Sequence, residues 1–154
     1  MKKFILIITL GTAALLNACQ QKSSNTSEQS ADTPAQNIAD GTHCFEYRVG
    51  QDVTSVQLVL NGSNVSGEMD WTPFEKDGGY GTLKGMRMGD EIVAVWSYTI
   101  EGSSQSEEVH FKIEGDQLMR KVGELEDPNF DGNLKLKDPA NATYSETYIK
   151  VDCQ

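Results

Sequence analysis

The 154-residue chain has few basic residues, only four prolines and only three cysteines. Its 13 Lys and Arg are outnumbered by 23 Asp and Glu, giving a formal net charge of −10. Such a surface repels a phosphate backbone, so the composition argues against nucleic-acid binding. The chain also lacks a phosphate-binding loop, a dinucleotide fingerprint and a Gly-x-Ser-x-Gly elbow. We therefore expect neither an enzyme nor a cofactor.

The longest apolar run lies at the N-terminus and is shorter than the roughly 20 residues that a membrane-spanning helix needs. Two lysines precede it, and it ends in Leu-Asn-Ala-Cys at Cys19. A basic start, a short apolar core and a small residue before the cleavage site are typical of an export signal. Apart from Asn17, the ending resembles the lipobox of bacterial lipoproteins, which implies removal of residues 1–18 and lipidation of Cys19. An ordinary secretory signal is the alternative.

Residues 19–41 are expected to form the lipidated cysteine and a flexible tether. Ser, Gln, Asn, Ala and Thr dominate this stretch, and Ile38 is its only large apolar residue. So little apolar surface cannot offset the entropy cost of ordering the chain. Gln20 stands where the lipoprotein resemblance implies Asp for retention at the inner membrane. We therefore expect an outer-membrane lipoprotein, facing the periplasm or the cell surface and held by its lipid alone.

From about residue 42 to residue 154, short segments of alternating apolar and polar residues predict an all-β domain. The expected strands are 44–49, 53–60, 64–71, 80–88, 92–100, 107–113, 118–125 and 144–151, with 133–137 as a weaker candidate. Short turns between successive strands favour an antiparallel meander, and about eight strands can close into a lipocalin-like β-barrel. A two-sheet sandwich is the alternative.

Cys44 and Cys153 are the two cysteines that lipidation leaves over. In an oxidising compartment they are expected to form a disulfide between the first and last strands. The bond would enclose about 110 residues and contribute roughly 4 to 5 kcal/mol in the chain-entropy model. Two free thiols or a metal pair are the alternatives.

Large aromatic residues on the expected inward faces mark a candidate ligand pocket formed by Trp71, Trp96 and Tyr98. Filling of the barrel core is the simpler explanation for the same residues. A small apolar molecule is the expected ligand.

The segment from Asp127 echoes a calcium-binding loop. Asp127, Asn129, Asp131 and Asp138 occupy ligand positions, and a glycine stands at position 6. Against calcium, no helices are expected beside the loop and Asp138 replaces the usual long glutamate. An Asp-Gly turn before a short strand is the preferred interpretation, so no metal is expected.

Four short motifs give the middle of the chain a distinctive pattern. They are Glu75-Lys76-Asp77, Gly-Thr-x-x-Gly at 81–85, Tyr-x-x-Glu-Gly at 98–102 and Glu-Val-x-Phe-Lys at 108–112. The pattern resembles a family of small lipoproteins of the Bacteroidetes type. The resemblance covers roughly residues 44–126 and implies no particular activity. Glu75, Lys76 and Asp77 are a candidate recognition turn, although a solvated hairpin tip is the preferred interpretation, because such a tip needs no partner.

Two functions are open at this point. The first is an envelope lipoprotein that presents a small barrel for ligand or protein binding. The second is an acidic inhibitor of a basic enzyme, because the chain is similar to lysozyme-inhibitor lipoproteins in size, anchor and terminal disulfide. After cleavage the net charge would change from −10 to −12, which would steer the domain toward a basic protein.

Overall fold

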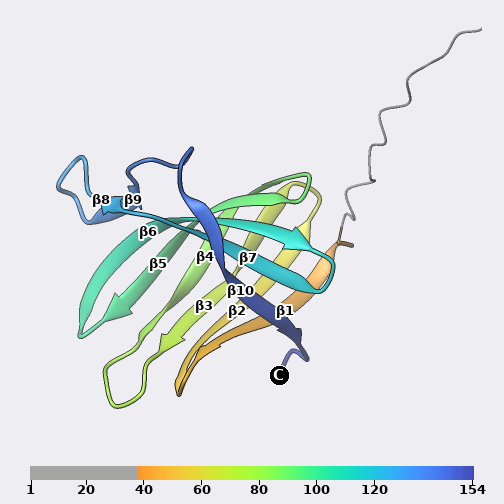
Figure 1. Ribbon diagram of the computed structural model, residues 1–154, viewed down its shortest axis with the longest axis horizontal. Helices are drawn as coiled ribbons and strands as arrows, with labels where there is room; N and C mark the ends of the chain where they lie inside the picture. The colour runs from red at the N-terminus through yellow and green to blue at the C-terminus, as the bar shows by residue number, and fades with distance from the viewer. Residues whose placement is uncertain (1–37) are drawn as a thin grey trace, which may run out of the picture. The chain divides into compact units, whose positions relative to one another are not determined.

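The computed structural model describes residues 38–154, which form an all-β domain (Figure 1). None of these residues belongs to a helix that could cross a membrane. The strands are β1 (Gly41–Val49), β2 (Asp52–Asn61), β3 (Asn64–Thr72), β4 (Gly79–Met88), β5 (Glu91–Ile100), β6 (Ser103–Glu114), β7 (Gln117–Val122), β8 (Leu125–Glu126), β9 (Asn133–Leu136) and β10 (Thr143–Val151).

Eight of these strands close into an antiparallel barrel, which confirms the predicted fold and excludes the sandwich. Strands β1 to β7 follow one another around the ring, and β10 fills the gap between β7 and β1. Closure joins the first strand to the last, with Cys44 opposite Val151. Because the ring has no free edge, its strands offer no long template for aggregation.

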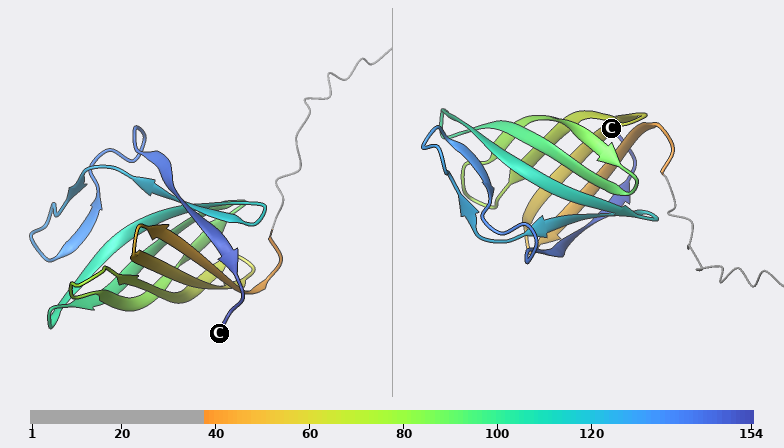
Figure 2. Two further views of the ribbon diagram at one scale, coloured as in Figure 1. Left: turned by 60° about the horizontal axis from the view of Figure 1, so that its bottom comes forward. Right: turned by 90° about the horizontal axis from the view of Figure 1, so that it is seen from above.

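The β8–β9 hairpin stands outside the ring (Figure 2). The sequence predicts one strand over 118–125, but this segment is divided into β7 and β8 around Gly123. A side chain at Gly123 would press on Ala142 and Leu136 at 3.1 and 3.2 Å. Strand β9, the weaker candidate, pairs in parallel with β6, where Asn133 lies opposite Ser106.

The barrel interior is filled by every second residue of each strand, as the predicted alternation requires. Phe45, Leu58, Phe111 and Tyr148 are among its fully buried side chains. The Tyr148 ring packs edge-on against Phe111, with ring centroids 6.3 Å apart. Burial of this apolar surface supplies the main favourable free energy of folding.

Glycines on the inward face of β4 let it approach β5 closely. A Cβ atom at Gly85 would lie 2.2 Å from the Val93 carbonyl oxygen, and one at Gly81 would lie 2.1 Å from that of Ser97. No side chain fits at such distances, so these positions require glycine. At Gly79 the space is occupied by the rings of Trp96 and Tyr98, each 3.3 Å from a Cβ atom.

The Cys44–Cys153 disulfide is present, with Cα atoms 5.2 Å apart, and it joins the C-terminal tail to β1. The same end of the barrel is covered by the residues that precede β1. Arg87 donates to the Ile38 carbonyl oxygen at 2.8 Å and pairs with Asp40 at 3.1 Å. Ile38 packs against the core. Residues 38–41, which the sequence places in the tether, are therefore folded against or within the barrel.

Candidate functional site: a charged aromatic pocket in the barrel mouth

A pocket of about 440 Å³ opens at the end of the barrel opposite the disulfide. Its lining comes from the last residues of β1, β3 and β5 and from the first residues of β2, β6 and β10, together with Arg120 of β7. All of these positions face inward, where the core gives way to the barrel mouth. The volume falls in the range of small-ligand sites.

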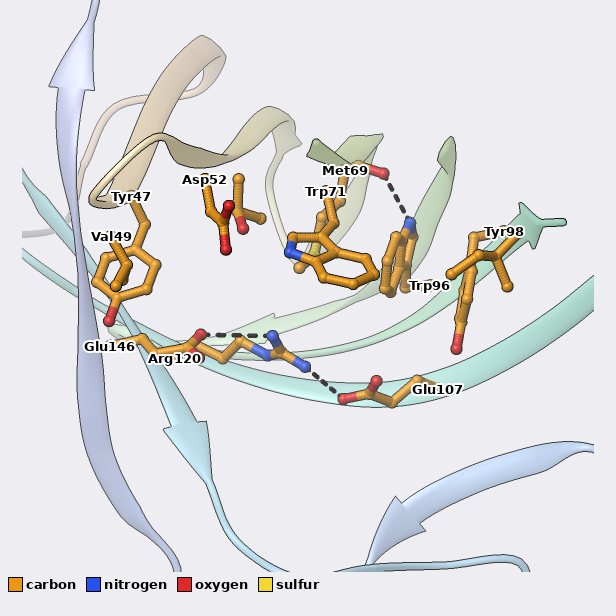
Figure 3. A pocket seen from close by; sticks show the side chains of 12 residues that line it. Tyr47, Val49, Asp52, Met69, Trp71, Trp96, Tyr98, Glu107, Arg120 and Glu146 are labelled. Carbon is orange, nitrogen blue, oxygen red and sulfur yellow. Dashed lines mark hydrogen bonds and ion pairs between the residues drawn. The ribbon is translucent and has the colours of Figure 1, made fainter. Parts of the chain in front are cut away.

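One wall of the pocket is aromatic. The rings of Trp96 and Tyr98 stack with centroids 3.9 Å apart, and the Trp96 indole N–H donates to the Met69 carbonyl oxygen at 2.7 Å. The Tyr98 hydroxyl donates to Gln105 at 2.9 Å. Burial raises the pKa of Tyr98, and the nearby Glu107 carboxylate adds to this shift. Trp71 lies beside this pair with its ring in the pocket (Figure 3).

The opposite side carries an arginine held between two glutamates (Figure 3). Arg120 donates to Glu107 at 2.5 Å and to Glu146 at 3.3 Å. The same Glu146 oxygen accepts the Tyr148 hydroxyl at 3.0 Å. Since the Arg120 and Glu107 side chains are only 18% and 10% exposed, the ion pair is largely removed from water.

Burial and neighbouring charges shift the pKa of Arg120 in opposite directions. Burial would lower the pKa of its guanidinium, but the charge of Glu107, with smaller contributions from Tyr148 and Glu146, raises it above its ordinary value. Burial also raises the pKa of Tyr148 above its ordinary value, against the opposing charge of Arg120. Arg120 therefore stays cationic and Tyr148 stays a neutral donor at physiological pH.

A third carboxylate, Asp52, lies on the wall formed by β2. One of its oxygens accepts the backbone N–H of Phe74 at 2.8 Å, which fixes the connection between β3 and β4 beside the mouth. The pocket thus combines one guanidinium with three carboxylates.

The sequence prediction of the pocket was incomplete. The structure places Trp71, Trp96 and Tyr98 along one pocket, although Trp96 is also a core residue. The three charged residues Glu107, Arg120 and Glu146 were missed. Each stands two positions from a buried residue on its own strand, so the alternation of inward positions contained the signal.

The candidate recognition turn lies close to the mouth. Glu75, Lys76 and Asp77 are exposed, and Glu75 adopts a left-handed backbone conformation with φ of 57°. Together with Trp71 and Glu101 they border a shallow hollow beside the pocket. The turn therefore contributes charged groups to the rim.

The calcium candidates do not come together. The Asp127 carboxylate accepts backbone N–H groups of Asp131 and Gly132, and the Asp138 carboxylate accepts two hydrogen bonds from Asn141 in a separate turn. Asn129 belongs to the first of these turns. Within residues 38–154, no three acidic, histidine or cysteine side chains are grouped for a metal ion. Asp127, Asn129 and Asp131 form the Asp-Gly turn before β9, and Asp138 lies after it.

The predicted signal and Cys19 lie outside the described residues. Comparison of the chain with protein-family models, with curated proteins and with solved structures found no match. The pocket is therefore the starting point for a functional proposal.

Proposed function

We propose that this chain is a bacterial envelope lipoprotein, anchored in the outer membrane through a lipid on Cys19, whose barrel binds a small ligand without transforming it. The observation that carries the binding proposal is the pocket in the mouth. It joins an apolar aromatic wall to a few fixed polar groups, the combination typical of small-molecule sites. The lipobox resemblance supports the anchor.

The geometry also supports a preformed site. Trp96, Tyr98 and Arg120 are each fixed by a hydrogen bond or an ion pair within the protein. A ligand that enters such a pocket does not have to order these side chains, so it loses less free energy to ordering on binding.

The test is native mass spectrometry of the domain purified from an oxidising compartment without refolding. We expect an adduct of small-molecule mass on the wild type and its loss in Trp71→Ala, which removes a wall of the pocket. Val95→Ala, on the outer face of the barrel, is the control and should retain the adduct. An empty wild-type protein, together with failure to bind any member of an amphiphile library, would refute the proposal.

A second candidate, an acidic inhibitor of a basic enzyme, is favoured by the rim. Glu75, Asp77 and Glu101 border the hollow beside the mouth, and Lys76 is the one basic residue among residues 38–154 that lines it. A basic protein docked on this rim should dissociate as salt rises, because exposed charges are screened. Binding in an apolar pocket should depend much less on salt. A salt titration against lysozyme separates the two functions.

A further inference from the structure

We propose that the mouth pocket selects an organic cation, namely an ammonium group attached to an aromatic or apolar body. This inference rests on the proposed ligand-binding function and specifies its ligand class. The evidence lies in how the four charged groups of the pocket are arranged and in what remains open on each of them.

Among the described residues that line the pocket, Arg120 is the one cation, and it is already neutralised. Arg120 uses N–H groups on both of its terminal nitrogens to bind Glu107 and Glu146. An anionic ligand that approached the guanidinium would meet these two carboxylates first. Like charges brought together in a partly desolvated site repel strongly. The pocket is therefore poorly suited to a fatty acid or another carboxylate.

The three carboxylates of the pocket, in contrast, can still accept hydrogen bonds. Glu107, Glu146 and Asp52 each use one carboxylate oxygen for the bonds described above, and the other oxygen has no hydrogen-bond partner among residues 38–154. With Arg120 included, the lining carries three negative charges and one positive charge. An ammonium group supplies three donors and a second positive charge.

The aromatic wall favours the same ligand. Trp71, Trp96 and Tyr98 present ring surfaces in the same cavity as the carboxylates (Figure 3). Indole and phenol faces attract cations and also pack against apolar or aromatic groups. A ligand with an ammonium head and an aromatic body would therefore satisfy both walls at once.

The experiment compares three probes that share a phenylpropyl body and differ only in the head group: 3-phenylpropylamine, 3-phenylpropanol and 4-phenylbutyrate. They are titrated into the full chain in phosphatidylcholine nanodiscs while tryptophan fluorescence is followed. Both tryptophans of the chain lie in the pocket, so binding there changes the signal directly. We expect the amine to bind at least about tenfold more tightly than the alcohol, and the carboxylate to bind most weakly, because of the charge balance of the pocket.

Isosteric variants test the residues. Glu107→Gln and Glu146→Gln should each weaken amine binding by roughly three- to tenfold and leave alcohol binding within twofold, since only the cation loses an opposite charge. Glu114→Gln is the matched control, because Glu114 is also paired with a basic residue but lies at the other end of the barrel. It should leave the binding of all three probes unchanged.

The outcomes separate this inference from the proposed function. Equal binding of amine and alcohol, or tightest binding of the carboxylate, would overturn the cation preference and leave a ligand-binding pocket in place. Failure of all three probes to change the fluorescence would count against both. If one glutamine variant does not fold, as judged by circular dichroism, the other variant and the wild-type probe series still decide the question.

Discussion

Replacement of Arg120 by methionine should destabilise the barrel strongly. The substitution keeps an apolar stem of similar length and removes the guanidinium that joins Glu107 to Glu146. Two carboxylates, with side chains 10% and 26% exposed, then lie near each other without a cation between them. Because burial disfavours an unpaired charge and like charges repel, the cost falls on the folded state.

The magnitude follows from the burial of the three side chains. Removal of one partner of a buried ion pair costs about 3 to 5 kcal/mol. Glu146 keeps some contact with solvent, so we expect the lower limit, about 3 kcal/mol. In a domain of this size each kcal/mol changes the melting temperature by about 4 °C, and Arg120→Met should therefore melt about 12 °C below the wild type.

Thermal unfolding followed by circular dichroism at pH 7 measures this difference. Arg48→Met is the matched control, because Arg48 pairs with Glu46 at 2.6 Å but its side chain is 62% exposed. Exposed ion pairs contribute about 0 to 1 kcal/mol, so this variant should melt within about 4 °C of the wild type. If both variants lose the same small amount, the charges in the mouth are fully solvated and the reasoning is wrong.

Three further predictions concern the barrel itself. Replacement of Cys44 and Cys153 by serine should lower the free energy of unfolding by about 4 kcal/mol, measured by urea denaturation. Gly85→Val should give no folded barrel by circular dichroism, because its Cβ atom would lie 2.2 Å from a carbonyl oxygen. Gly62→Ala is the control, since its Cβ atom would meet nothing within 4 Å. It should lower the free energy of unfolding by only about 1 to 3 kcal/mol, the cost of the left-handed backbone at this position. Since burial raises the pKa of Tyr148 in the folded state, the stability that this tyrosine contributes is present below pH 10 and is lost as the pH rises. Urea denaturation at a series of alkaline pH values should therefore show a smaller fall in the free energy of unfolding for Tyr148→Phe than for the wild type.

The sequence was sufficient to predict the barrel because its strands alternate cleanly. In β5, inward residues such as Ile92 and Ala94 alternate with outward ones such as Val93, and the turns between strands are marked by glycine. The disulfide was predicted from the two cysteines left in an oxidising compartment, and closure of the barrel brings the strands that carry them side by side. Local pattern and global fold agree here, which is typical of sequences that specify one structure.

The end of β7 was not predictable in the same way. The predicted strand runs from Leu118 to Leu125 across Gly123, because a single glycine within a strand does not by itself mark its end. At the break, Ala142 and Leu136 leave little room for a side chain, since a Cβ atom at Gly123 would lie 3.1 and 3.2 Å from them. The alternation of residues within one strand does not report such packing against other segments.

The contact among Glu107, Arg120 and Glu146, here called the ion cluster, was also not predictable from the sequence. The alternation of inward and outward residues along each strand explains why Glu107, Arg120 and Glu146 point inward. That they meet depends on the register between β6, β7 and β10, including the irregularity in the β7–β10 pairing near Glu146. Register is set by closure of the whole ring and not by any one segment. The alternation within each strand therefore contains the inward direction of the three charges but not their contact.

The cost of burying these charges leads to a last prediction, which separates a structural role from a binding role. Apolar replacements for a buried ion cluster are often neutral or stabilising by about 1 to 4 kcal/mol. The triple variant with Glu107→Leu, Arg120→Met and Glu146→Leu should therefore melt at or above the wild-type temperature, although Arg120→Met alone melts far below it. In the same protein, binding of 3-phenylpropylamine should be lost, because two of the three carboxylates of the pocket are gone. A triple variant as unstable as Arg120→Met would mean that the cluster is needed to hold β6, β7 and β10 together. Stability without binding would instead mean that the chain carries these charges for its ligand.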